Sequence, residues 1–206
     1  MRCTTSHREI GGESCDVPRA LEPFGKAGVN RGELLTRLTI WLALCAYATG
    51  AGMMLLARHR AHWLARARWA WTIGCGFFLA HVASAFSYYH GWSHAAAYRE
   101  TARQTGEVTG FRWGGGIFFN YLFAIAWLAD VVWWWLAPRS FARRPRWINL
   151  TWQSFFLFMV FNGTVVFGKG PVRWLGWLIC AVLGSLWWQS RRALRRDQVA
   201  TRRSDG

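Results

Sequence analysis

Two histidines four residues apart, His90 and His94, are the side chains whose spacing points most directly to chemistry. If one helix carries both, they lie on the same face, where two imidazoles can bind one transition-metal ion. Glu100 and Glu107 are the nearest carboxylates that could supply a further ligand. The five residues read His-Gly-Trp-Ser-His, so the glutamate base of an HExxH zinc protease is missing. The pattern therefore indicates a candidate metal site of His90, His94 and Glu100 without that base.

A third histidine, His81, lies deeper in the same apolar stretch and has two interpretations. As a b-type haem ligand it would need a methionine or another chain as its axial partner, because the other predicted spans contain no histidine. As a polar group it would hydrogen-bond across the bundle to a serine, threonine or asparagine. Asn120 and Asn162 fall at a similar predicted depth. With His81 and His90 they could form a polar zone that binds a small ligand or an ion, or relays protons. The methionines considered are Met53, Met54 and Met159.

Five apolar blocks must position these residues. Of the 206 residues 53% are hydrophobic, and arginine clusters separate the apolar blocks. Each block approaches the roughly 20 residues that cross about 30 Å of hydrocarbon, so we predict an all-α polytopic membrane protein. Residues 1–33 are predicted to be a flexible arm that lacks the apolar core of a signal peptide, and 190–206 a basic tail. The predicted spans are 34–57, 69–90, 117–137, 148–168 and 172–189.

Two connections carry glycine signals. Gly-Lys-Gly-Pro at 168–171 predicts a tight helical hairpin, because proline cannot continue a helix. Residues 92–108 are predicted to form an amphipathic, partly helical segment with Arg99, Glu100 and Arg103 facing water. The three glycines at 114–116 then predict either a mobile lid or a plain loop that another segment approaches closely.

The arginines set the orientation. The links after the first and third predicted spans, together with the tail, carry fourteen arginines, whereas the two opposite links carry five basic residues. The positive-inside rule therefore predicts an N-terminus outside and a C-terminus in the cytoplasm. The excess of 23 arginines over two lysines is typical of a bacterial inner-membrane protein.

Tryptophan and aspartate mark the predicted cytoplasmic ends. Ten of the 16 tryptophans fall there, where an interfacial belt is expected. Asp130 is the one acid inside a predicted span, and we expect it to form an ion pair with Arg143, Arg144 or Arg68. The ten tryptophans are Trp63, Trp69, Trp71, Trp133, Trp134, Trp135, Trp147, Trp152, Trp187 and Trp188.

The remaining signals concern partners. The net charge of +15 is explained by arginines beside apolar blocks, which contact anionic lipid headgroups, and we expect no nucleic-acid partner because base-reading motifs are missing. Cys3 and Cys15 could form a disulfide in an oxidising compartment or remain free thiols.

Three function classes are open to such a chain. The first is a non-catalytic membrane subunit or scaffold, in homo- or hetero-oligomers, with a histidine-containing polar zone in the outer half of the membrane. The second is a metal- or haem-binding redox or enzyme subunit that uses His90 and His94, or His81. The third is a small transporter or channel component. We favour the first class, because a complete catalytic constellation is not visible in the sequence.

Overall fold

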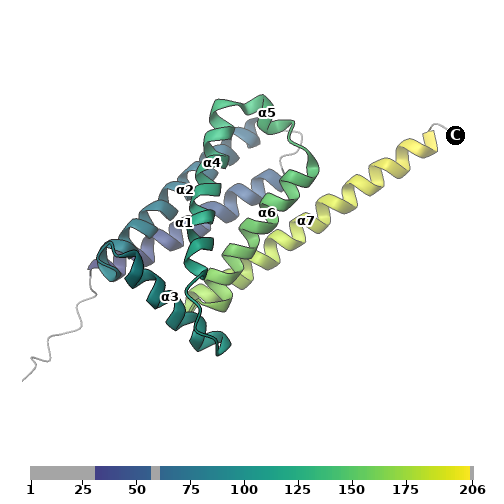
Figure 1. Ribbon diagram of the computed structural model, residues 1–206. Helices are drawn as coiled ribbons and strands as arrows, with labels where there is room; N and C mark the ends of the chain where they lie inside the picture. Colours follow the sequence, from purple (N-terminus) through teal and green to yellow (C-terminus); the bar gives the residue numbers. More distant parts are fainter. Residues whose placement is uncertain (1–30, 57–60, 205–206) are drawn as a thin grey trace, which may run out of the picture.

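The computed structural model describes residues 31–56 and 61–204, and Cys3 and Cys15 lie outside these ranges. Every regular element of the described chain is helical, as predicted (Figure 1). The elements are α1 (Arg31–Leu56), α2 (Ala61–Tyr89), α3 (His94–Thr109), α4 (Gly116–Leu136), α5 (Pro138–Ala142), α6 (Arg146–Phe161), the π-helical turn η1 (Asn162–Val166) and α7 (Pro171–Ser204).

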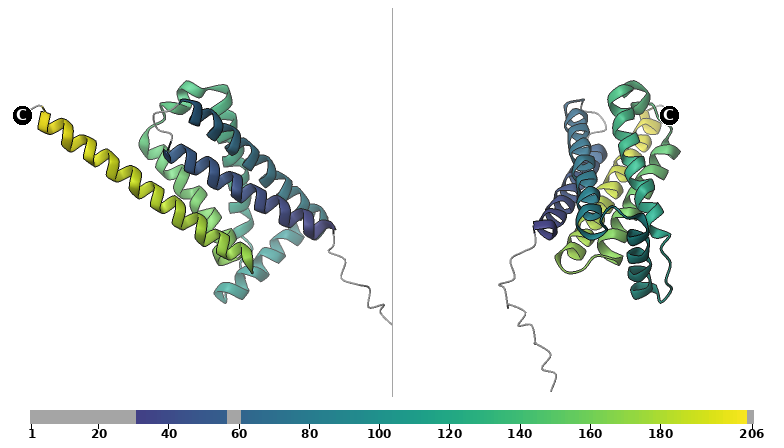
Figure 2. Two further views of the ribbon diagram at one scale, coloured as in Figure 1. Left: turned by 180° about the vertical axis from the view of Figure 1, so that it is seen from behind. Right: turned by 60° about the vertical axis from the view of Figure 1, so that its left-hand side comes forward.

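Three of the described helices, α1, α2 and α4, are long and apolar enough to cross a membrane. The fourth and fifth predicted spans are also helical. The α6 helix has 16 residues and continues directly into η1, and α7 runs on through the segment predicted as a separate basic tail. Figure 2 shows that this long last helix extends beyond the rest of the bundle.

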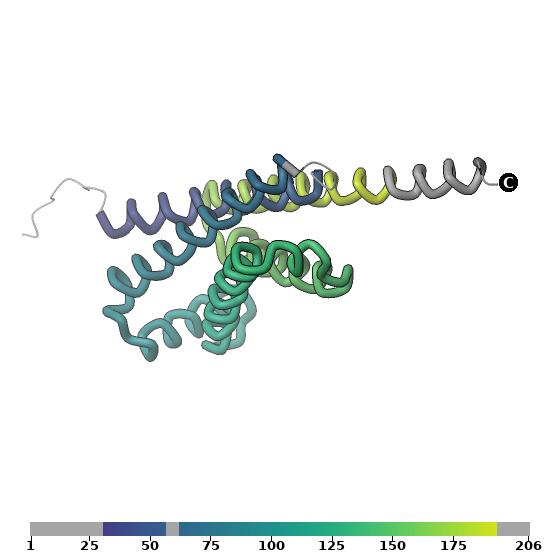
Figure 3. Tube along the Cα trace, turned by 90° about the horizontal axis from the view of Figure 1, so that it is seen from above, coloured from purple at the N-terminus to yellow at the C-terminus, as the bar shows by residue number. Residues whose placement is uncertain are grey.

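The bundle has two ends of different make-up. The α3 end contains α3 and the connection between η1 and α7, and the α5 end contains α5 with the arginines around it (Figure 1). The α1 helix packs closely on α2 and also contacts α7, beside which it runs in the view of Figure 3.

Small residues bring α1 and α2 together, as their sequence positions suggest. A Cβ atom added at Gly50 would lie 3.2 Å from the backbone nitrogen of Trp71. One added at Gly74 would lie 3.3 Å from the backbone nitrogen of Tyr47 and 3.0 Å from the Trp127 ring. Such contacts let two helix backbones approach more closely than larger side chains permit.

Aromatic rings from four helices fill the centre of the bundle. Tyr47 of α1, Trp71 of α2, Trp127 of α4 and Phe156 of α6 each expose 2% or less of their surface. The Trp71 ring centroid lies 5.3 Å from that of Trp127 and 5.2 Å from that of Phe156, which is the usual range for favourable aromatic pairs. The aromatic core thus joins α1, α2, α4 and α6 at the centre of the bundle.

The prediction of an interfacial tryptophan belt is wrong for two of its members. Trp71 is fully buried in the aromatic core, and Trp134 is 7% exposed and stacks on Phe141 at 4.4 Å. Trp69 and Trp147 are exposed, as a belt requires. Sequence position along a helix cannot separate these two groups, because helix rotation decides which indoles face inward.

The predicted tight hairpin is confirmed. The η1 turn and α7 contact each other, and a Cβ atom added at Gly176 would collide with the Thr164 hydroxyl oxygen. Thr164 is buried and donates its hydroxyl to the Val160 carbonyl at 2.6 Å, so its polar group is satisfied within its own helix.

The second predicted span ends at Tyr89 and does not continue through Gly91. Gly91 and Trp92 both adopt positive φ, at 53° and 58°, which terminates α2. Ser93 then caps α3, its hydroxyl accepting a hydrogen bond from the Ala96 amide. The predicted amphipathic segment is thus a separate helix.

The glycines before α4 are a closely approached loop. A Cβ atom at Gly114 would lie 2.6 Å from the carbonyl oxygen of Tyr98 in α3. Gly114 and Gly115 are buried, so α3 packs directly against this stretch of backbone.

The helix contact at Gly74 can be tested by substitution. We expect Gly74→Val to destabilise the protein by about 1–3 kcal/mol, because the added methyls meet the α1 backbone and the Trp127 ring. Gly76→Val in the same helix is the matched control, since a Cβ atom there meets nothing within 4 Å. Urea unfolding in detergent, followed by tryptophan fluorescence, measures both. Equal losses for the two variants would show that helix propensity, not packing, sets the effect.

Candidate functional site

A charged pocket of about 1010 Å³ lies at the α3 end of the bundle. Four separate segments form it: the first turns of α1, the end of α2, one face of α3 and the connection between η1 and α7. Most of its polar wall is contributed by α3, whose residues at spacings of three and four lie on one face. The lining residues are Thr36, Arg37, Ala85, Tyr89, His90, Ala96, Arg99, Glu100, Arg103, Gln104, Glu107, Val108, Phe167 and Lys169.

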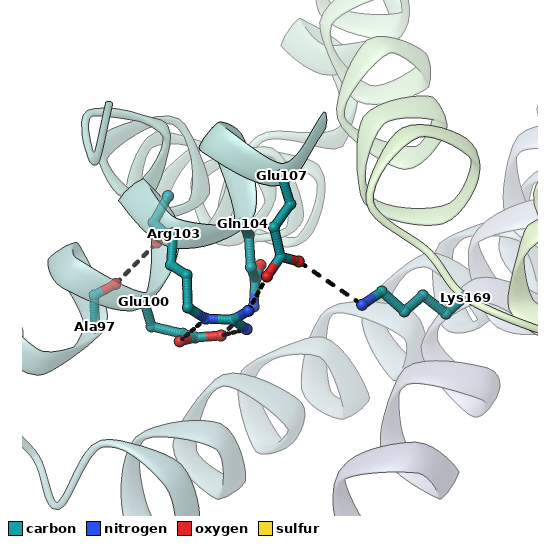
Figure 4. Close-up of polar contacts among 7 residues, drawn as sticks. Ala97, Glu100, Arg103, Gln104, Glu107 and Lys169 are labelled. Atoms are coloured by element: carbon teal, nitrogen blue, oxygen red, sulfur yellow. Dashed lines mark hydrogen bonds and ion pairs between the residues drawn. The ribbon is translucent and has the colours of Figure 1, made fainter. Parts of the chain in front are cut away.

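A chain of ion pairs runs across this pocket from α3 to the connection between η1 and α7 (Figure 4). The Arg103 guanidinium donates to both carboxylate oxygens of Glu100, at 2.9 and 2.5 Å, and to Glu107. The other Glu107 oxygen lies 3.8 Å from the Lys169 ammonium. Gln104 adds a hydrogen bond to Glu100 at 2.9 Å. The network therefore links α3 to the α6–α7 hairpin across a gap in sequence of more than sixty residues.

The carboxyl group of Glu100 is strongly perturbed by its pairing with Arg103. The Arg103 hydrogen bonds lower its pKa to about 2, with smaller contributions from Gln104 and from the charge of His90. The same pairing raises the pKa of Arg103. Both side chains are partly exposed to solvent, which limits how much their pairing stabilises the fold.

The structure places the three residues proposed as metal ligands in different surroundings. His90 lies beyond the end of α2 and lines the pocket with Glu100. His94 is the first residue of α3, and its Nδ1 atom lies 2.8 Å from the hydroxyl of Tyr121 in α4. The two positive-φ residues between them break the helical spacing that would have put both imidazoles on one face. Within residues 31–56 and 61–192, no group of three or more His, Cys, Asp or Glu side chains is placed to hold a metal ion.

His81 forms a link between the first two helices. Its Nδ1–H donates to the Thr36 carbonyl of α1 at 3.0 Å, a backbone oxygen rather than the side-chain partner expected. This leaves Nε2 as the nitrogen with the lone pair, the arrangement that histidine ligands of metals commonly use. Thr36 itself lines the pocket, so His81 lies directly behind the pocket wall.

The two asparagines do not join His81. Asn162 donates its side-chain amide to the Phe158 carbonyl at 2.9 Å, within its own helix. Asn120 lies on the exposed face of α4. The predicted polar zone is thus replaced by the pocket, whose polar groups come mainly from α3.

At the α5 end, the expected ion pair of Asp130 is present with Arg144 as its partner. The Arg144 guanidinium donates to the Asp130 Oδ1 atom at 2.6 Å, and the two side chains are 5% and 0% exposed. The Trp71 indole approaches the same carboxylate, although outside ordinary hydrogen-bond geometry. Arg68, the alternative partner, instead places its guanidinium 4.1 Å from the centre of the Trp135 ring.

Several pocket residues were missed at the level of sequence. Arg37, Tyr89 and Lys169 belong to three different segments, and their meeting follows only from the fold. The Glu100, Arg103 and Glu107 cluster carried a signal that could have been used, because its spacings of three and four place the charges on one helical face.

No family model, no curated protein and no solved structure matches this chain.

The Asp130–Arg144 pair predicts an asymmetric response to mutation. We expect Arg144→Gln to cost about 3–5 kcal/mol of unfolding free energy, because it leaves a buried carboxylate without a counter-charge. Asp130→Asn should cost less unfolding free energy than Arg144→Gln. The double variant should lose less than the sum of the two single losses, by more than about 1 kcal/mol. Arg143→Gln, at the exposed neighbouring position, serves as control. Additive single effects in urea unfolding would contradict a coupled pair.

The ion-pair network of α3 is expected to weaken at acidic pH. The folded-state pKa of Glu100 is lowered to about 2, so its stabilising effect is present above the ordinary value of 4.5 and is lost as the pH falls from there toward about 2. We expect faster hydrogen exchange in α3 over this pH window after correction for intrinsic rates, and Glu100→Gln should abolish the transition. Glu33→Gln, which removes the comparable pair with Arg37 in α1, should leave the acid transition of α3 unchanged.

Proposed function

We propose that this chain is a five-span integral membrane protein with its N-terminus outside and its C-terminus in the cytoplasm. The lengths of α1, α2 and α4, and the helical α6–η1 and α7 segments, support five crossings. The arginine excess on the links at the α5 end supports the orientation, in which the α3 end faces outward. The arginine bias supports placement in a bacterial inner membrane, with anionic headgroups around the α5 end.

Within this topology, the protein acts as a non-catalytic subunit or scaffold, alone or in an oligomer, that binds a ligand at its outward face. The observation that carries this proposal is the pocket of about 1010 Å³, which four segments of the chain build together. Its size is in the range of sites that hold small molecules, roughly 300–1,000 Å³. The metal-binding alternative has less support, because His94 contacts Tyr121 and is not among the residues that line the pocket with His90 and Glu100.

The charge balance of the pocket favours an anionic ligand. Four basic side chains line it against two carboxylates, and both carboxylates are already engaged by Arg103. Arg99 has no ion-pair partner among the described side chains and is exposed on the pocket wall. Apolar surface also lines the pocket, from Tyr89, Val108 and Phe167 among others. An amphiphile with one anionic group matches this combination of surfaces.

Cysteine labelling tests the orientation and the pocket together. Three single-cysteine variants are made in a cysteine-free background. Val108→Cys lies in the pocket, and Trp113→Cys lies outside the pocket, beyond the end of α3. Ser140→Cys lies at the α5 end. A membrane-impermeant maleimide should label the first two in intact cells and the third only after permeabilisation. Labelling of the Ser140→Cys variant from outside would overturn the orientation.

Protection by a probe tests the ligand class. Decyl sulfate should slow labelling of the Val108→Cys variant by about tenfold at ten times its dissociation constant, by simple mass action. Decyltrimethylammonium should not, and neither compound should protect the Trp113→Cys variant. Equal protection by both amphiphiles would overturn selectivity for anions.

A further inference from the structure

A second pocket, of about 510 Å³, lies at the α5 end of the bundle, and its assignment rests on the proposed function, which places anionic headgroups around this end. The end of α4, the short α5, and the connection into α6 form it. It is lined by Trp133, Arg139, Ser140, Arg143, Arg144, Pro145 and Ile148. We propose that this pocket holds the phosphate of one anionic phospholipid.

The charge of this pocket matches a phosphate group. Three guanidinium groups line it, and no carboxylate is among its lining residues. Guanidinium groups bind phosphate oxygens through paired N–H donors, which makes arginine the preferred side chain for such sites. The Ser140 hydroxyl, which accepts a hydrogen bond from the Trp133 indole at 3.3 Å, is a further potential donor to a phosphate oxygen.

Asp130 holds one of these arginines in place from inside the bundle. It accepts from a single terminal nitrogen of Arg144, so the remaining guanidinium N–H groups are not engaged by that carboxylate. The Arg144 guanidinium also lies 4.1 Å from the centre of the Phe141 ring and 5.9 Å from that of Trp133, within the range of cation–π attraction. Arg144 is therefore preorganised, whereas Arg139 and Arg143 are exposed and can close on a ligand.

The position of the pocket favours a lipid as the source of the phosphate. It begins where the membrane-crossing helix α4 ends, which is the level of the headgroups in either orientation. Leu136 and Trp147, adjacent in sequence to this pocket region, expose 82% and 69% of their surface and are apolar. A phosphate in the pocket thus leaves apolar surface nearby for the glycerol and acyl chains, which a soluble phosphate compound would not use.

The test is a lipid titration of the purified full-length chain in dodecyl maltoside, followed by native mass spectrometry. The probes are dioleoyl phosphatidylglycerol and dioleoyl phosphatidylcholine. The pocket variant is Arg139→Gln/Arg143→Gln, which leaves Arg144 in place so that Asp130 remains paired. The matched control is Arg191→Gln/Arg192→Gln in α7, which removes the same charge from exposed arginines elsewhere. A thermal melt confirms that both variants are folded.

We expect the unmodified chain to retain one phosphatidylglycerol about tenfold or more tightly than phosphatidylcholine, since arginines near the membrane surface attract anionic headgroups. The pocket variant should lose this preference and the α7 variant should keep it. Equal binding of the two lipids, or an equal loss in both variants, would overturn the proposal. Displacement of the lipid by equimolar glycerol 3-phosphate would show that the site serves a soluble phosphate and would also overturn it.

Discussion

A buried ion pair connects the core of this bundle to the surface at its α5 end. Asp130 lies beside the aromatic core, fully shielded from solvent, and its negative charge requires a partner that reaches it there. That partner, Arg144, comes from the connection between α5 and α6, so the pair holds this connection against α4. The turn at the α5 end, the stacking of Trp134 on Phe141 and the arrangement of the basic pocket all depend on it.

The opposite end is organised by a break in a helix rather than by a buried charge. Because α2 stops at Tyr89 and the backbone turns through Gly91 and Trp92, α3 is free to pack on the glycine loop before α4. Its charged face then lies over the end of α2 and the start of α1. The ion-pair chain from Glu100 to Lys169 connects this face to the α6–α7 hairpin, which lies next to it only in the folded chain.

The two ends differ in a way that suits a membrane protein with separate contacts on its two sides. The α3 end has mixed charges in a wide pocket, where a solvated ligand can be selected by the balance of its groups. The α5 end has a cluster of arginines, one of which is paired with a buried carboxylate. This arrangement suits the anionic lipid headgroups of a membrane. Between them, the aromatic core and the close α1–α2 contact form a closely packed centre.

Much of the fold could be predicted from the sequence. The length and apolarity of the blocks define α1, α2 and α4, and the Gly-Lys-Gly-Pro segment defines the hairpin, because these are local properties of the chain. The lone acid in an apolar block similarly required a basic partner, and Arg144 was among the expected ones.

The composition of the sites was decided by the tertiary structure. A helix-spacing argument for His90 and His94 holds only while the backbone stays helical, and positive φ at two consecutive residues ended it. The grouping of Arg37, Glu100 and Lys169 depends on how distant helices pack, which no local pattern records. The sequence by itself therefore determined which segments can lie in a membrane, since hydrophobicity is local. Only the fold decided which polar groups meet, since meeting depends on helix rotation and on contacts between residues far apart in the chain.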